Sequence, residues 1–222
     1  MLISLGRDGL CAYVRSQLEH NFPDGIRSDV DTVVDGALER LEHCFKWIAL
    51  PGYNRDQHAS FNHLHGDQTA VFYYLASNTA FQRGDTTLAQ KFFLLNKAMN
   101  GIVCMYDTEL PPVFAFIHTT GTMVGKAHYG NFVALFQGVT VGADRGELPT
   151  FGERCIVYGG SIVVGGSHLG DGVVVAGNSA IIHQDVPANS IAAGRSPALD
   201  IAPRKRDVAA QYFRLGAAAA PS

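Results

Sequence analysis

The chain has 222 residues, a formal net charge of −3 and a sequence pI near 6.3, so its overall charge offers no electrostatic basis for binding nucleic acid. No apolar stretch approaches the roughly 18 residues of a membrane span, and the N-terminus lacks the basic and apolar regions of a signal peptide. Four scattered cysteines show no metal or redox spacing, which is typical of a reducing compartment. We therefore expect a cytoplasmic protein without a membrane segment.

Residues 1–105 have few glycines and show helical periodicity, which predicts a helical N-terminal region. Asp29 or Ser28 is placed to cap a first helix. Further helical stretches are predicted from Gln57 to Phe81 and from Thr86 to Met99, the latter ended by Asn100-Gly101. Apolar residues of the capped helix recur three and four residues apart, at Val30, Val33, Val34, Ala37, Leu38, Leu41, Cys44 and Phe45.

Residues 106–202 form the second predicted region, and a six-residue repeat runs through it from Ile117 to about Val186. Bulky residues occupy every sixth position in two series: Ile117, Met123, Tyr129, Leu135 and Val141, then Phe151, Val157, Val163, Leu169, Val175 and Ile181. A helix would repeat at three or four residues and an exposed strand at two, whereas a fixed period of six is typical of a parallel β-helix. Three faces of six residues predict coils of roughly 18 residues, about four in number. A β-sandwich is the alternative, but it would place turns every 8–12 residues.

A shift of four residues separates the two series, between Gly142 and Thr150. A solenoid accommodates extra residues by extruding a loop at a corner. The acidic, basic and glycine residues of this segment indicate an exposed loop, which is either a substrate lid or a neutral surface insertion.

The C-terminal residues 203–222 form the third region. A short helix is predicted from Pro203 to Leu215, and the low-complexity tail from Gly216 to Ser222 is predicted to be disordered.

Three motifs carry a family resemblance. His118-Thr-Thr-Gly121, Met123-Val-Gly125 and Gln137-Gly-Val-Thr-Val-Gly142 resemble the hexapeptide-repeat acyltransferases and are most similar to the serine acetyltransferases. The segment from Val186 to Ala198 also resembles the closing motif of that family. The resemblance implies an α+β protein in which an N-terminal helical region precedes a left-handed parallel β-helix.

The same resemblance implies a CoA-dependent O-acetyltransferase that transfers acetyl from acetyl-CoA to a hydroxyl of serine, a sugar or another small metabolite. His118 matches the family's general base. Such proteins are homotrimers with acetyl-CoA sites between neighbouring prisms; a dimer of trimers stays open. The residues implied along the CoA channel are Gly159, Gly160 and Ala176, with Arg195 and Ser196 near the nucleotide end.

A carboxylate usually orients such a histidine, and Asp107 and Glu109 are the candidates just upstream. Candidate substrate-binding residues are His128 in the next coil and Asp144 and Arg145 in the extruded loop.

The chain departs from the serine acetyltransferases where that family holds its acceptor. Val103 and Ile117 stand where the family has carboxylates, and the histidine of the family's loop is missing. The reaction type is compatible with these departures, but the acceptor is left open.

Three other functions stay open at this stage. N-acetylation of an amino sugar is the nearest alternative. A zinc protein like the γ-class carbonic anhydrases would need three converging histidines, which His118, His128 and His168 do not obviously supply, so no metal is expected. A trimeric scaffold without catalysis is the third.

Overall fold

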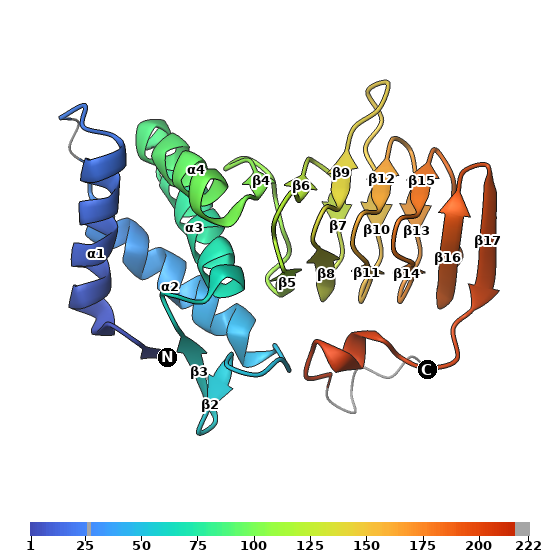
Figure 1. The fold of residues 1–222 in the computed structure, drawn as a ribbon, viewed down its shortest axis with the longest axis horizontal. Coiled ribbons are helices and arrows are strands. Elements are labelled where there is room, and N and C mark those ends of the chain that lie inside the picture. The colour runs from blue at the N-terminus through green and yellow to red at the C-terminus, as the bar shows by residue number, and fades with distance from the viewer. Residues whose placement is uncertain (26–27, 216–222) are drawn as a thin grey trace.

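The computed structural model describes residues 1–25 and 28–215, and it combines a helical layer with a parallel β-solenoid of about five turns. The helices lie at one end of the solenoid, whose coils then stack away from them along the long axis (Figure 1). The predicted α+β architecture of N-terminal helices followed by a parallel β-helix is confirmed. The tail predicted to be disordered, residues 216–222, lies outside the described residues.

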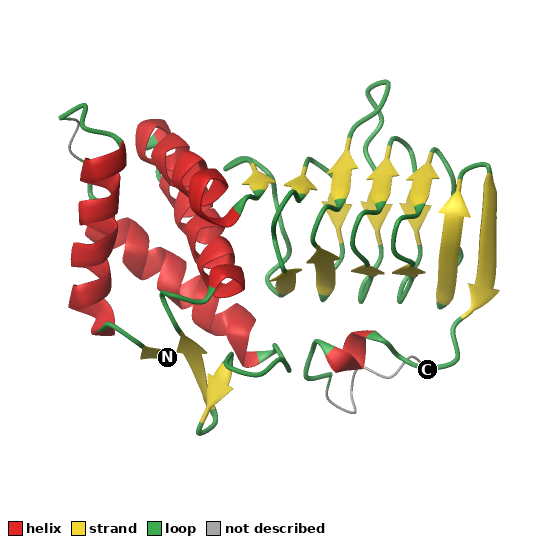
Figure 2. Ribbon diagram, in the orientation of Figure 1, coloured by secondary structure: helices red, strands yellow, loops and turns green. Residues whose placement is uncertain are grey.

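Four α-helices build the N-terminal layer (Figure 2). The Asp29 carboxylate accepts a hydrogen bond from Thr32 N and caps α2, as predicted, and Gly101 ends α4 in the left-handed conformation with φ +66°. Their bounds are α1 Gly6–Asn21, α2 Val30–Lys46, α3 Gly66–Gln82 and α4 Thr86–Asn100.

The helix predicted from Gln57 begins later than expected. Residues His58–Phe61 form strand β3, which pairs with β1 (Leu2–Ile3) and β2 (Asn54–Arg55). Burial alternates along β3, with Ala59 and Phe61 buried. A burial period of two residues is typical of a strand, so this segment is extended and the helix begins only at Gly66.

Three faces enclose the solenoid core, and we name each after one strand. Equivalent residues of successive coils pair 18 apart, as in Ile156 with Val174 and Ile162 with Ala180. The β9 face contains β4 Val103–Cys104, β6 Met123–Val124, β9 Thr140–Gly142, β12 Ile162–Val164 and β15 Ala180–Ile182; the β10 face contains β7 His128–Tyr129, β10 Thr150–Phe151 and β13 His168–Leu169; the β8 face contains β5 Phe114–Ile117, β8 Val133–Phe136, β11 Ile156–Val157 and β14 Val174–Val175.

The predicted inward columns hold from the second coil onward. Each of these bulky positions is at most 3% exposed: Leu135, Val141, Phe151, Val157, Val163, Leu169, Val175 and Ile181. Successive coils therefore stack aliphatic side chains in register, and each coil closes the apolar core of the one before it.

The first coil differs from the predicted six-residue phase. Met123 is 51% exposed, and Val124 takes the inward position opposite Val141. On the preceding strand Phe116 pairs with Leu135. Eight residue steps therefore separate Phe116 from Val124, whereas six separate the equivalent residues Leu135 and Val141 in the next coil. The two additional steps belong to the turn that carries His118.

The C-terminus folds back along the solenoid. After the β16–β17 hairpin (Ser190–Arg195 and Ala198–Pro203), residues 204–215 form a segment that we call the C-terminal strap. Tyr212 packs edge-on against Phe136, and Ala49 N donates a hydrogen bond to Tyr212 O at 2.8 Å. The predicted helix is reduced to one 3₁₀ turn, Ala209–Gln211, because the backbone of this segment bonds instead to the residues that follow α2, as in Arg214 N to Trp47 O.

The outward sides of the three faces differ. Residues Ala134, Ile156 and Val174 of the β8 face are at most 4% exposed on the side where the C-terminal strap lies (Figure 1). The β10 face presents His128, Thr150 and His168 in register. The β9 face presents apolar side chains that no described part of the chain buries fully: Met123, Ile162, Val164 and Ile182.

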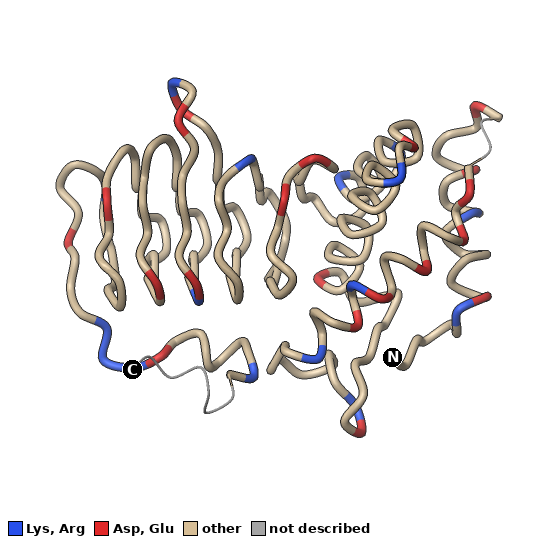
Figure 3. The backbone as a smooth tube through the Cα atoms, turned by 180° about the vertical axis from the view of Figure 1, so that it is seen from behind, with Lys and Arg blue, Asp and Glu red and all other residues tan. Residues whose placement is uncertain are grey.

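Charged residues are sparse along the coils and gather on the helices, the extruded loop, the turns and the strap (Figure 3). Among the described residues, no helix combines the length and apolarity needed to cross a bilayer.

Close stacking of the coils gives a stability prediction. A Cβ on Gly130 would lie 2.7 Å from Glu153 N and against the Gly152 carbonyl, whereas a Cβ on Gly142 meets nothing within 4 Å. Gly130→Ala should destabilise the fold by about 1–3 kcal/mol because backbone has to shift. Gly142→Ala is the matched control and should leave the denaturation midpoint unchanged. Equal midpoints for both variants would contradict the close approach of the coils.

Candidate functional site

His118 projects from the turn between β5 and β6, at the edge where the β8 and β9 faces meet. Its backbone is left-handed, with φ +54°, and its side chain is 76% exposed. A residue with a Cβ seldom adopts this conformation, so the surrounding contacts must hold it there.

Asp67 in the first turn of α3 supplies one of those contacts. Its Oδ1 accepts a hydrogen bond from His118 N at 2.9 Å, and its Oδ2 lies 3.9 Å from His118 Nδ1. The Asp67 side chain is only 15% exposed. The second distance exceeds hydrogen-bond range but places a negative charge beside the imidazole.

The helical layer fixes the rest of the turn. Thr119 Oγ1 donates to Asn100 O at 2.7 Å, and Gly121 N donates to Gly101 O at 3.0 Å. The C-terminal end of α4 and the N-terminal end of α3 therefore both hold the turn. The helices thereby determine how His118 is presented.

The implied CoA-channel residues Gly159 and Gly160 lie on the same edge as His118. We call this the His118 edge; it comprises the turns 118–122, 137–139, 158–161 and 176–179, and it includes Ala176. With strands about 4.8 Å apart, three coil steps from His118 to Ala176 span roughly 14 Å. Arg195, which pairs with Ala180, and Ser196, whose Oγ accepts from Ile182 N, continue over the last coil.

The upstream carboxylates have other surroundings. Asp107 Oδ2 lies 2.8 Å from Lys126 Nζ. Glu109 lines a 450 Å³ cavity together with His128 and Phe151, beside the β10 face. The prediction that Asp107 or Glu109 orients His118 stays a prediction, and the carboxylate that the structure places beside His118 is Asp67.

The segment between β9 and β10 is an extruded loop, as predicted, and it rises above the coils (Figure 1). Arg145 is fully at the surface, with a side chain 84% exposed. Asp144 Oδ2 accepts from His183 Nε2 at 2.8 Å, and this hydrogen bond holds the pKa of Asp144 below its ordinary value. This loop leaves the edge between the β9 and β10 faces, one edge away from His118.

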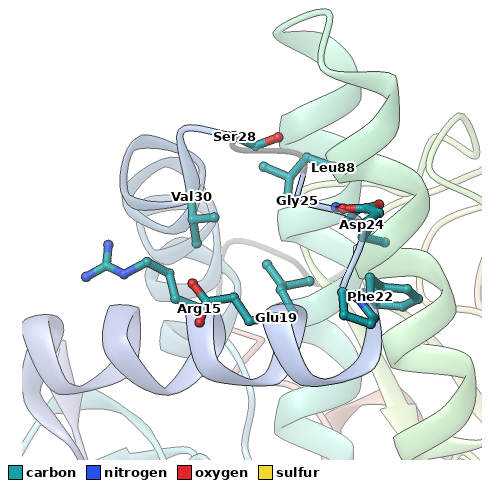
Figure 4. Close-up of a pocket in the computed structure, with 11 residues that line it drawn as sticks. Arg15, Glu19, Phe22, Asp24, Gly25, Ser28, Val30 and Leu88 are labelled. Atoms are coloured by element: carbon teal, nitrogen blue, oxygen red, sulfur yellow. Dashed lines mark hydrogen bonds and ion pairs between the residues drawn. The ribbon is translucent and has the colours of Figure 1, made fainter.

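A cavity of 670 Å³ lies apart from these residues, in the helical layer. It opens between α1, the start of α2 and α4, and is lined by Arg15, Glu19, Phe22, Asp24 and Leu88 among others (Figure 4). Within residues 1–25 and 28–215, no group of three His, Cys, Asp or Glu side chains is placed to hold a metal ion.

Asp67 was missed by sequence reasoning because it lies 51 residues before His118, in the helical region. A local signal existed: an acidic residue opens a helix after an irregular segment. Nothing in the sequence pairs that helix start with the His118 turn.

The sequence of the chain matches those of known serine acetyltransferases. Over 130 residues the chain is 27% identical to the serine acetyltransferase of Helicobacter pylori, covering 56% of this chain and 75% of that protein. It is 25% identical to the Mycobacterium tuberculosis enzyme, with 56% of each covered, so the chain spans little more than half of that relative. The sequence relatives that match the chain are serine acetyltransferases. No protein-family model matches it.

Solved serine acetyltransferase structures share the fold of this chain. The enzyme from Brucella abortus superposes with a TM-score of 0.60 at 16% identity, covering 86% of this chain and 74% of that one. The enzyme from Vibrio cholerae gives 0.59 at 18%, covering 87% and 71%. A serine acetyltransferase in complex with CoA gives 0.56 at 16%, covering 86% and 75%. The similarity therefore includes helices as well as coils.

The Asp67–His118 contact gives a prediction that does not depend on turnover. Asp67→Ala removes the acceptor of the His118 amide, so hydrogen exchange of residues 116–121 should accelerate about tenfold, the effect of one hydrogen bond to a charged group. Asp67→Asn keeps an oxygen at the same position and should retain most of the protection. If Asp67→Ala exchanged no faster than the wild type, the helix would not be holding the turn.

Proposed function

We propose that the chain is a CoA-dependent O-acetyltransferase in which His118 deprotonates the hydroxyl of a small acceptor. One observation carries the proposal: an exposed imidazole, held in a left-handed turn beside a carboxylate, stands on an edge lined by Gly159, Gly160 and Ala176. The sequence similarity to serine acetyltransferases supports the same reaction class.

The chemistry needs a base of this type. A hydroxyl is far too weak an acid to ionise at neutral pH, and imidazole, with an ordinary pKa near 6.5, is well matched to take its proton. The hydroxyl oxygen then forms a bond to the thioester carbonyl carbon, the carbon–sulfur bond breaks, and the thiolate recovers the proton from the imidazolium. Asp67, 3.9 Å from Nδ1, would stabilise that imidazolium and leave Nε2 for the acceptor.

Acetyl-CoA fits the His118 edge. Gly159 and Gly160 add no side chains of their own to this edge, and the side chain of Gln137 lies over Gly159, with its Nε2 2.7 Å from where a Cβ would stand. The thioester would lie near His118, with the pantetheine arm along the later coils toward Arg195 and Ser196. One of the structures similar to this chain is a serine acetyltransferase bound to CoA.

A neighbouring copy of the chain would complete the site. The β8 face is occupied by the C-terminal strap and the β10 face is polar, so the apolar β9 face is the one suited to association. Parallel sheets are usually covered on both sides. This face lies between the His118 edge and the loop edge. A homotrimer built on it would bring the loop of one protomer, with Asp144 and Arg145, toward the His118 of the next.

The acceptor is a hydroxyl compound of small size. Serine is one candidate, and sugars and other metabolites are others, because Val103 lies in β4, paired with Met123, where the serine acetyltransferases carry a carboxylate. Acceptor choice would fall to Asp67 and the extruded loop.

Thiol release tests the reaction directly. The protein is mixed with acetyl-CoA and, in turn, serine, sugars, amino sugars and small alcohols. We expect CoA thiol to be released in the presence of at least one hydroxyl acceptor. His118→Ala should lower kcat by about 10²–10⁴-fold, the usual contribution of a general base, while CoA binding measured by calorimetry stays close to that of the wild type.

His168→Ala, on the β10 face, is the matched control and should retain turnover. If amino sugars were acetylated selectively and on their amino group, the reaction would be N-acetylation and the proposed O-acetylation would be wrong. Full turnover by His118→Ala would remove the histidine from its assigned role, and failure to bind CoA would overturn the proposal.

The assembly has its own test. Ile162→Glu places a charge in the proposed contact, where it would be buried without a partner, and should reduce the sedimentation mass from a trimer toward a single chain. Thr150→Glu, on the polar β10 face, should leave the mass unchanged. A wild-type chain that sediments as a monomer at micromolar concentration would contradict the trimer.

A further inference from the structure

His183 lies between two carboxylates of the extruded loop. Its Nε2 is 2.8 Å from Asp144 Oδ2, and its Nδ1 is 3.1 Å from Glu147 Oε2. His183 belongs to the turn after β15, two coils beyond the strand from which the loop departs. One imidazole therefore joins the loop to the body of the solenoid.

The coil beneath the loop is shaped for this contact. A Cβ on Gly165 would lie 2.5 Å from the His183 ring, and one on Gly166 would meet the Glu147 carboxylate. Both positions therefore need glycine while the imidazole and the loop stay in place. Asp144 and Glu147 also exchange backbone hydrogen bonds, at 3.1 and 3.0 Å, so the loop offers both carboxylates from one rigid turn.

Two partners compete for Nδ1. Gly166 N lies 3.2 Å away and requires a lone pair on Nδ1, whereas the Glu147 carboxylate requires a proton there. A neutral ring that donates Nε2–H to Asp144 accepts a hydrogen bond from Gly166 N at Nδ1 and makes no hydrogen bond with Glu147. A protonated ring donates to both carboxylates and leaves the Gly166 amide without this acceptor. A single proton on Nδ1 therefore moves one hydrogen bond from the coil to the loop.

We propose that His183 is a pH-dependent latch: protonation of its Nδ1 fastens the extruded loop through Asp144 and Glu147 together, and deprotonation releases the Glu147 side. The latch is independent of the reaction proposed above and acts as a positioning device for the loop. It does not require His183 to touch a substrate.

The direction of the pH dependence follows from the charges. The hydrogen bonds that His183 donates, to Asp144 first and also to Glu147, raise the pKa of His183 above its ordinary value, and the same bond lowers the pKa of Asp144. The remaining charged group of the cluster is Arg145, whose Nε lies 3.9 Å from Asp144 Oδ2. The two hydrogen bonds from protonated His183 to the loop carboxylates are fully formed below the ordinary imidazole pKa. The bond to Glu147 is lost as the pH rises through the raised pKa of His183. At the acid end the bond to Asp144 is lost as the pH falls through the lowered pKa of Asp144.

Nitrogen-15 spectra of the histidine rings test the latch. In the full chain, His183 should titrate above the ordinary histidine pKa of about 6.5, and above its own pKa it should carry the ring proton on Nε2. Glu147→Gln should lower the pKa of His183, as should Asp144→Asn. If His183 titrated at or below the ordinary histidine pKa, or kept its wild-type pKa in Glu147→Gln, the proposal would be overturned.

Hydrogen exchange of residues 143–149, corrected for the intrinsic effect of pH, provides the second measurement. The wild-type loop should open about tenfold more readily once His183 is neutral, because one hydrogen bond to a charged group is lost. His183→Gln should exchange quickly at every pH, whereas His168→Gln should keep the wild-type profile. A loop whose corrected exchange is independent of pH in the wild type would also overturn the latch.

Discussion

The structure depends on coils stacked in register about 18 residues apart. No single coil can bury its inward side chains, because its neighbours above and below provide most of the contact. Leu135, Val157 and Val175 illustrate this dependence: they pair along one face and are almost completely buried. The helical layer starts this stack, since α3 packs against β5 and gives the first coil a covered end. Without such a start, the first coil would expose apolar side chains to water.

The sequence predicted those features that repeat. The period of six identified the solenoid, its inward columns and the position of the extruded loop, because each coil imposes the same steric demand. Asp29 and Gly101 also acted as predicted, since helix caps depend on local chemistry. The outcome differs from prediction where packing outside the repeat decides it. Met123 turns outward, and the helix predicted after Pro203 is shortened to a single 3₁₀ turn within the strap.

The candidate site shows the same division. His118 is recognisable from its motif, but its carboxylate neighbour Asp67 comes from a helix 51 residues earlier, and only the tertiary structure brings them together. The pairing of Asp107 with Lys126 likewise depends on how the chain enters the first coil. Contacts between a repeat and a non-repeating layer leave no periodic trace in the sequence. The same holds for His183, which lies 39 positions after Asp144.

The β16–β17 hairpin closes the far end of the solenoid. Strand β16 continues the parallel stack, but β17 runs antiparallel to it and occupies the hydrogen-bonding groups that a sixth coil would use. Pro203 contributes no amide hydrogen to the outermost strand, and Asp200 adds charge there. An open parallel stack is a template onto which any similar chain can add end to end. Reversing the last strand removes that template, so a second copy finds no parallel edge on which to extend the stack into a fibre along its axis.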